Sequence, residues 1–165
     1  MPTAVVPVLQ AFLGADGVCS RNSALRNRAT ALLQRFLRSA GALVAPHGAT
    51  LVAGLLPALA TEGIPPADRL SLYECLGAVL GARPPGAPAL LRDVVAPLCA
   101  QLTPAHVPTG SASAALAALA VLSRGIALHD STPADEALAQ VFAETLPSAV
   151  ALLSAAPRDP ALWQQ

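Results

Sequence analysis

Four short phrases built around a proline recur along this chain and constrain its fold more than any other feature. They are Val5-Val6-Pro7-Val8-Leu9, Leu55-Leu56-Pro57-Ala58-Leu59, Val95-Ala96-Pro97-Leu98 and Thr145-Leu146-Pro147-Ser148-Ala149. Their prolines are 50, 40 and 50 residues apart, an interval that accommodates two helices and two turns. A proline inside a helix costs about 3 kcal/mol unless the helix bends there, so the recurrence predicts a similar kink in one helix of each pair.

The composition favours a fold made only of helices. Hydrophobic residues make up 54% of the 165 residues but aromatic residues only 3%, and alanine and leucine dominate. Alanine and leucine are good helix formers, whereas the β-branched and aromatic residues typical of strands are scarce. Together with the spacing of the prolines, this predicts an all-α, HEAT-type helical-repeat solenoid.

Clusters of glycine, proline and aspartate divide the chain into seven expected helices. The expected helices cover residues 3–14, 22–41, 46–60, 67–81, 87–103, 110–128 and 134–156. Taken in alternating order, they form about three and a half antiparallel helix pairs. We therefore expect one repeat segment over residues 1–156 and a short tail over residues 157–165.

The second expected helix concentrates the positive charge of the chain. All ten Lys+Arg residues are arginines, the formal net charge is zero, and residues 25–39 hold four of the ten. On a helix, the apolar residues form one stripe: Leu25, Ala29, Leu32, Leu33, Phe36, Leu37 and Ala40. Arg21, Arg28 and Arg35 recur every seven residues and form a second stripe. A row of guanidinium groups suits phosphate, although many basic helix faces are simply solvated.

The first helix pair follows the general HEAT pattern, with Asp16 in the turn and Arg26 at the start of the second helix. In HEAT repeats such residues commonly pair between neighbouring repeats, so we expect structural roles for both. Arg28, Arg35 and Arg38 are then the freer candidates for binding.

The remaining reactive side chains indicate no catalytic or metal chemistry. Three cysteines (Cys19, Cys75, Cys99) lack the spacing of a metal site or a disulfide framework, and we expect reduced, mostly buried thiols of an intracellular protein. Three histidines (His47, His106, His129) are scattered. No glycine-rich phosphate loop, nucleophile elbow or acid/base pair occurs, so we expect neither an enzyme nor a bound cofactor. The uncharged run 39–61 is interrupted by prolines and glycines, which favours a buried helix over a membrane span.

Four phrases resemble the exportin-T family of nuclear tRNA export receptors, which belongs to the importin-β (karyopherin) group. They are Arg26-Asn27-Arg28-Ala29 with Leu33-Gln34-Arg35-Phe36-Leu37-Arg38-Ser39, then Leu72-Tyr73-Glu74-Cys75-Leu76-Gly77, then Leu90-Leu91 with Val95-Ala96-Pro97-Leu98-Cys99, and Ala120-Val121-Leu122-Ser123-Arg124-Gly125. They occur in the family's order and cover about residues 3–156.

The resemblance implies a non-catalytic receptor that binds tRNA together with the GTP form of the small GTPase Ran. Such a receptor shuttles between nucleus and cytoplasm through contacts with nuclear pore proteins. If the second helix of each pair lines the inner wall, Arg21, Arg28, Arg35 and Arg38 face the RNA. A complete exportin is several times longer, so the chain would be a middle slice whose terminal repeats expose apolar faces unless another segment caps them.

Two further expectations concern packing and an alternative function. Tyr73 is expected to be a core aromatic with a hydrogen-bonded tip beside a surface carboxylate, Glu74, and Gly77 to permit close helix packing. The alternative to an RNA receptor is a helical-repeat scaffold that binds protein without RNA cargo.

Overall fold

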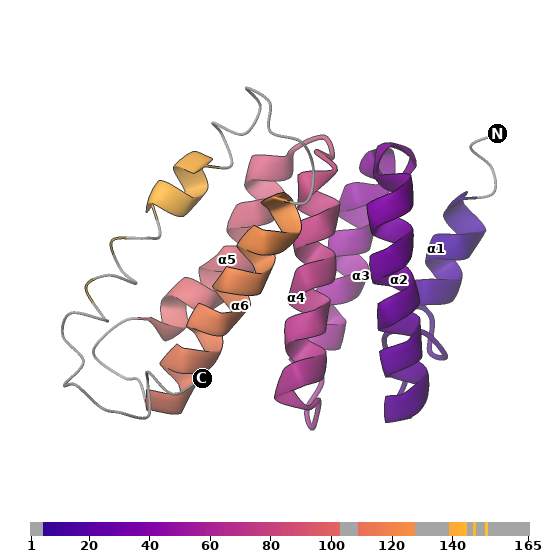
Figure 1. Cartoon of the computed structure of the whole chain (residues 1–165), viewed down its shortest axis with the longest axis horizontal. Coiled ribbons are helices and arrows are strands. Elements are labelled where there is room, and N and C mark those ends of the chain that lie inside the picture. Colours follow the sequence, from indigo (N-terminus) through magenta and orange to yellow (C-terminus); the bar gives the residue numbers. More distant parts are fainter. Residues whose placement is uncertain (1–4, 103–108, 128–138, 145–146, 148–150, 152–165) are drawn as a thin grey trace.

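Every regular element of the protein is helical in the residues that the computed structural model describes, which are 5–102, 109–127, 139–144, 147 and 151 (Figure 1). The helices are α1 (Val5–Leu13), α2 (Ser23–Val44), α3 (Gly48–Ala60), α4 (Pro66–Gly81), α5 (Ala87–Gln101) and α6 (Thr109–Ala127), with a short 3-10 turn, η1 (Ala45–His47), before α3. The described ranges contain no strand, which confirms the all-α class.

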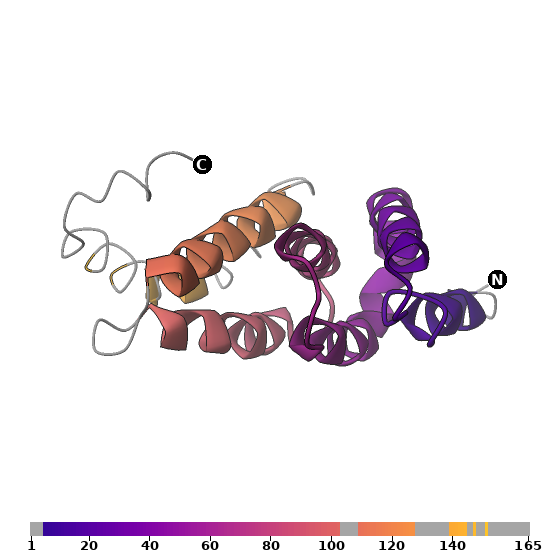
Figure 2. The same cartoon turned by 90° about the horizontal axis from the view of Figure 1, so that it is seen from below.

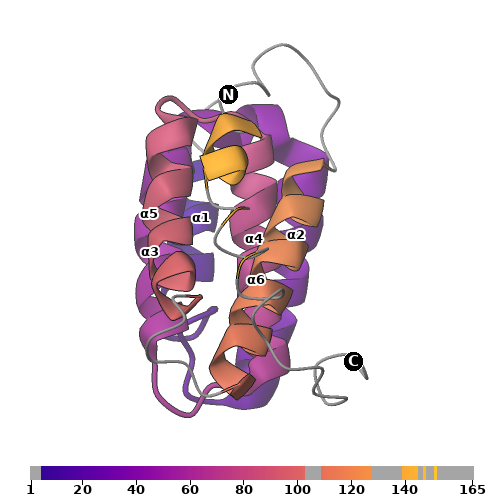
Figure 3. The same ribbon diagram turned by 90° about the vertical axis from the view of Figure 1, so that its left-hand side faces the viewer.

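The helices form two layers in alternating order. Viewed from below and from the end, α1, α3 and α5 form one layer and α2, α4 and α6 form the other (Figures 2 and 3). Neighbours within each layer are in contact, as are the two members of each consecutive pair. Consecutive helices therefore alternate between the layers, and each layer is built from every second helix.

The expected helix boundaries agree with the observed ones for all six helices to within three residues. The largest difference is at the end of α2, which continues to Val44 through a break at Ala40, where φ is −122° and ψ is 21°. Of the expected helix 134–156, residues 139–144 are helical, and its other described residues are 147 and 151. The remainder of that segment and the expected tail, 157–165, lie outside the described residues.

Three of the recurring prolines lie in the first layer, one in each of its helices. Pro7, Pro57 and Pro97 lie inside α1, α3 and α5, and all three are exposed. Within the described helices, backbone angles outside the helical range are found at Ala40 of α2. A proline inside a helix leaves the carbonyl four residues before it without its helical hydrogen bond, and on an exposed face of the helix water can reach that carbonyl.

Helix α4 is the centre of the hydrophobic core. Its residues Leu72, Cys75, Leu76, Val79 and Leu80 are fully buried because α2, α3 and α6 pack around it. The core is aliphatic and contains few aromatic rings, which agrees with the composition.

Helices α4 and α6 approach each other closely at two glycines. The Cα atoms of Gly77 and Gly125 are so near that a Cβ added to either one would lie 2.9 Å from the other's Cα. A Cβ on Gly77 would also overlap the carbonyl oxygen of Leu122, and one on Gly125 would lie 2.8 Å from that of Glu74. The expected packing role of Gly77 is therefore confirmed.

The apolar stripe expected on α2 is only partly buried. Leu33 and Leu37 lie in the core, whereas Leu25 and Leu32 are 46% and 50% exposed. Arg26 and Thr30 occupy core-facing positions beside Leu33 and Leu37, because this side of α2 faces α4. The large apolar side chains with the greatest exposure in the described ranges all lie on the first helix pair: Val6, Val8, Leu25, Leu32 and Leu43.

Candidate nucleic-acid interface

The basic helix α2 begins with a side-chain cap. The Asn22 side-chain oxygen accepts hydrogen bonds from the backbone N–H groups of Ala24 (3.0 Å) and Leu25 (3.3 Å). An Asn at this position satisfies N–H groups that have no partner inside the helix. Arg21 therefore precedes the helix and does not belong to its surface stripe, contrary to the expectation from the seven-residue spacing.

Arg26 is a structural residue, as expected, and its partner lies on the next helix of the same layer. Its Nε and Nη2 atoms donate to Oδ2 of Asp68 on α4, at 3.2 and 2.8 Å, and its Nη1 donates to the Ser20 carbonyl at 3.0 Å. The side chains of Arg26 and Asp68 are only 8% and 13% exposed. Asp16 lies exposed in the turn before α2 and forms no ion pair with any described residue.

Three more polar contacts continue the α2–α4 interface from this ion pair. The Cys75 thiol lies 3.9 Å from the Thr30 carbonyl, and Gln34 Nε2 donates to the Ser71 carbonyl and to Glu74, both at 3.2 Å. Arg38 reaches the same Glu74 carboxylate at 3.9 Å while remaining about half exposed. We refer to these contacts and the Arg26–Asp68 pair as the polar seam. Glu74 is thus half-buried within the seam and is not the surface carboxylate expected.

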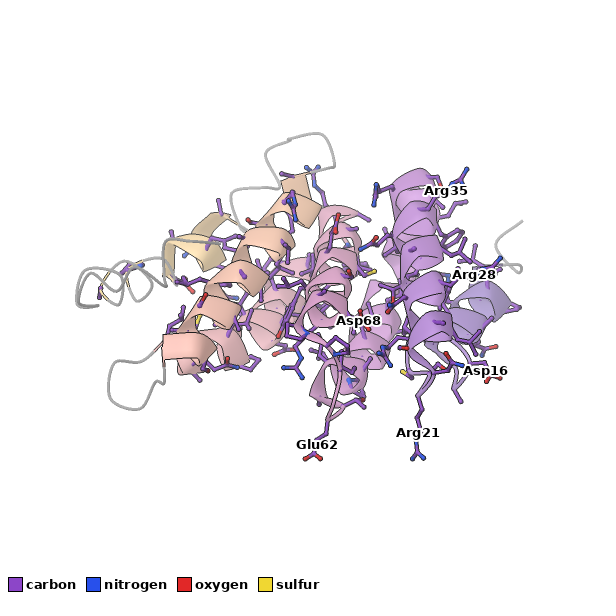
Figure 4. All side chains as sticks on the ribbon, turned by 60° about the horizontal axis from the view of Figure 1, so that its bottom comes forward. Asp16, Arg21, Arg28, Arg35, Glu62 and Asp68 are labelled. Carbon is purple, nitrogen blue, oxygen red and sulfur yellow. The ribbon has the colours of Figure 1, made fainter. Side chains whose placement is uncertain are left out.

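The four expected RNA-binding arginines do not form a single row. Arg28 and Arg35 lie on the side of α2 opposite its buried face and point into solvent together, while Arg21 extends from the end of the helix (Figure 4). These three make no ion pair or side-chain hydrogen bond with the described residues. Arg38 is turned toward Glu74. Arg28 and Arg35 are therefore the freest cations on α2.

Charge is distributed unequally between the two layers. Helices α2, α4 and α6 carry six arginines and two acidic residues, and both acids, Asp68 and Glu74, belong to the polar seam. In the other layer, α1 and α3 contain no charged residue, and α5 contains one arginine and one aspartate. The second layer therefore presents Arg28, Arg35, Arg69 and Arg124 as exposed cations, without an exposed acid on the same helices.

Arg69 and Arg124 were not among the residues expected from the sequence. They lie singly on α4 and α6, and neither forms a cluster along the chain. They are identified by the difference in charge between the two layers, since α2, α4 and α6 all carry arginines without an exposed acid. This difference becomes visible only when every second helix is grouped together, and no local motif shows it. They place one exposed arginine on each of the other two helices of this layer.

A shallow apolar groove of about 330 Å³ lies beside Arg28, between α1 and α2. Its walls include Val8, Phe12, Leu25 and Leu32, and Asp16 contributes a carboxylate to its lining. A second hollow, of about 500 Å³, lies at the helix ends beside Arg21. The surface near these arginines thus combines positive charge with exposed apolar side chains.

The three cysteines are free thiols, of which one is fully buried and two are partly exposed. Cys75 is completely buried, and burial raises the pKa of its thiol to about 12. Burial also raises the pKa values of Cys19 and Cys99, which are partly exposed. No group of three or more metal-ligating side chains occurs among the described residues.

Tyr73 lies in the core, but its hydroxyl does not have the expected hydrogen bond. The residue is 8% exposed, and its hydroxyl has no protein partner in the part of the chain that the structure describes. Buried tyrosine hydroxyl groups usually have a partner.

Comparison with protein-family models, with curated proteins and with solved structures found no match for this chain. Two helical stretches, Ser23–Ala60 and Gly110–Ala127, are long and apolar enough to cross a membrane, a test that core helices of soluble proteins also pass.

Proposed function

We propose that this chain is part of a helical-repeat export receptor of the exportin-T type, and that the α2–α4–α6 layer is its tRNA-binding side. The observation that carries the proposal is the unequal charge of the two layers. The exposed cations of the second layer have no exposed carboxylate on their own helices to compete with phosphate.

The arrangement of the helices supports a HEAT-type solenoid as the framework of this receptor. Consecutive helices alternate between two layers, and the prolines recur in α1, α3 and α5. The Arg26–Asp68 ion pair joins the second helices of two successive pairs. The resemblance to exportin-T itself rests on the four short phrases in the sequence.

The chemistry of the proposed surface is suited to the RNA backbone and not to base reading. Arginine binds phosphate through a planar fork of donors, and such contacts fix the position of a nucleic acid without selecting its sequence. A receptor that carries many tRNA species requires recognition of shape and backbone. Binding of Ran-GTP and of nuclear pore proteins, with shuttling between nucleus and cytoplasm, belongs to the same proposal for the whole receptor.

The test is the salt dependence of tRNA binding by the chain and by a variant with Arg28→Ala and Arg35→Ala. We expect the double variant to bind about tenfold more weakly and the slope of log K against log salt to fall by about 2, because each lost phosphate contact removes about one unit. Fluorescence anisotropy with labelled tRNA measures both quantities. An Arg92→Ala variant, altered in the other layer, is the matched control and should bind as the parent does.

Equal affinity of the parent and the double variant for tRNA would remove Arg28 and Arg35 from the interface. No measurable binding of tRNA by the parent at low salt would instead count against an RNA surface on this segment as a whole.

A protein-binding scaffold is the second candidate, and the exposed apolar side chains of the first pair favour it. Leu25 and Leu32 line the groove beside Arg28, where they are suited to an apolar partner surface. This candidate predicts partner binding that survives moderate salt and weakens after Leu32→Asp. It also predicts no preference for folded tRNA over a simple RNA duplex.

A further inference from the structure

Two adjoining hollows lie between α4 and its neighbours, away from the basic face of α2. One, of about 310 Å³, lies among α3, α4, α5 and α6, and the other, of about 300 Å³, lies between α4 and α6. Arg69, Tyr73, Ala114 and Ala118 line both of them. Each volume is at the lower end of the range typical of small-molecule sites.

The hollows result from the way in which α4 and α6 diverge. The two helices run in the same direction, since the N-terminal residues Pro66 and Gly110 line one hollow together while Gly77 meets Gly125 further along. From that contact the helices separate toward their N-terminal ends (Figure 1). The residues of α6 that line the widening gap all have small side chains, which do not fill it: Gly110, Ser113, Ala114, Ala117 and Ala118.

Two polar side chains at this gap, those of Tyr73 and Arg69, favour an anion, and the neutral side chains of Gln101 and Ser113 also line it. Tyr73 is 8% exposed and lines both hollows, and its hydroxyl has no protein acceptor or donor within the described ranges. Desolvation raises the pKa of this hydroxyl, with Arg69 acting in the opposite direction, so the group remains a proton donor at neutral pH. Arg69 is exposed and forms no ion pair with a described residue. The N-terminal ends of both helices lie at the same end of the gap, and their dipoles also favour negative charge.

The remaining walls are apolar. Leu56 and Leu59 of α3 and Val94 and Leu98 of α5 line the hollow deeper between the layers. The site therefore combines one cation and one hydroxyl donor with an aliphatic chamber.

We propose that this gap binds an aliphatic monocarboxylate, with the carboxylate held by the Arg69 guanidinium and the Tyr73 hydroxyl and the hydrocarbon chain lying between α4 and α6. One cation and one neutral donor match the single charge and two oxygens of a carboxylate. The chain packs against the leucines and valine that line the deeper hollow. This site shares Arg69 with the basic layer of the proposed RNA surface but uses neither Arg28 nor Arg35, so the variant with Arg28→Ala and Arg35→Ala should bind decanoate as the parent does.

Tyr73 is the only tyrosine of the chain, so it provides a single-site reporter. The experiment is an NMR titration of the full-length protein, labelled on the tyrosine ring, with decanoate as the probe. We expect the Tyr73 ring signals to shift and to saturate. Arg69→Met should weaken decanoate binding at least tenfold while leaving the binding of decanol, which has no charge, within about twofold. A Tyr73→Phe variant, followed by calorimetry, should also bind decanoate more weakly.

A variant that fills the gap tests the location of the site. Ala114 is exposed and lines both hollows, so Ala114→Leu should abolish decanoate binding without disturbing the fold, and Ala120→Leu, on α6 outside the gap, should bind as the parent does. The proposal is wrong if decanoate produces no saturable shift of the Tyr73 signals in the folded parent. It is also wrong if Arg69→Met or Ala114→Leu binds decanoate as tightly as the parent.

Discussion

Helix α4 has parallel neighbours on both sides, and the two interfaces are built differently. On the α2 side, the polar seam connects the helices through side chains, from Arg26–Asp68 at one end to Arg38–Glu74 at the other. On the α6 side, Gly77 and Gly125 bring the two backbones into direct contact, and no side-chain hydrogen bond or ion pair is recorded between α4 and α6 in the described ranges.

The difference shows that two successive contacts in one layer can be stabilised by different means. At the polar seam, directional hydrogen bonds between side chains fix the register of α2 and α4, whose backbones do not meet as closely as those of α4 and α6 do at the two glycines. At the glycine contact, close approach increases dispersion contacts but permits the helices to diverge beyond it. The gap beside Tyr73 lies on that diverging side of α4.

The largest expected effect is at the glycine contact. Gly77→Ala places a methyl group against the Leu122 carbonyl, so α6 must move, and we expect a loss of about 3 kcal/mol in the free energy of unfolding. Urea denaturation followed by circular dichroism measures the change. Gly110→Ala, where nothing lies within 4 Å of an added Cβ, is the matched control and should be neutral or stabilising by up to about 1 kcal/mol.

The next largest effect is expected at the buried end of the polar seam. Asp68→Ala leaves the Arg26 guanidinium largely buried without its carboxylate, which should cost about 2 kcal/mol in the free energy of unfolding, since the pair retains some exposure to water. The double variant with Arg26→Met and Asp68→Leu should recover much of this loss, since no charge is then left unpaired. Denaturation curves of the three proteins provide the comparison. A double variant no more stable than Asp68→Ala would show that the pair is required for packing and not only for its charge.

Cys75, within the polar seam, should make the free energy of unfolding depend on pH. Its thiol pKa is about 12 in the folded chain, compared with 9.0 for an unperturbed thiol. The unfolded chain therefore releases this proton first, so stability should fall as pH rises from about 9 toward 12. In Cys75→Ala, which lacks this group, the fall between pH 9 and pH 11 should be smaller. Alkylation at pH 8, followed by mass spectrometry, should modify Cys19 and Cys99 before Cys75.

The smallest expected effect is in the exposed half of the seam. Gln34→Ala removes two hydrogen bonds of 3.2 Å to Ser71 and Glu74, both in a partly solvated position. Water can replace these partners, so we expect a loss of only about 0.5–1 kcal/mol. A loss as large as that of Asp68→Ala would contradict the proposed gradient from the buried end of the seam to the exposed end.

The candidate site was predictable in its composition but not in its geometry. The sequence identified Arg28 and Arg35 as binding candidates because they lie seven residues apart on an amphipathic helix, and both are exposed on one face. It placed Arg21 in the same stripe by its seven-residue spacing, although Arg21 precedes the helix, which begins after the Asn22 cap. It predicted a structural role for Arg26 but did not identify its partner, Asp68, which is 42 residues away along the chain.

The sequence by itself determined the helical class, the positions of six helices and the layer that carries the prolines. These features depend on local propensity, on turn residues and on periodicity, all of which act within about twenty residues. Only the tertiary structure decided which charges are paired, which leucines of α2 are exposed and why the Tyr73 hydroxyl is left facing a gap. These outcomes depend on how each packed helix is rotated about its axis and on how far neighbouring helices diverge. For α4 and α6, the contact between Gly77 and Gly125 fixes the point of closest approach.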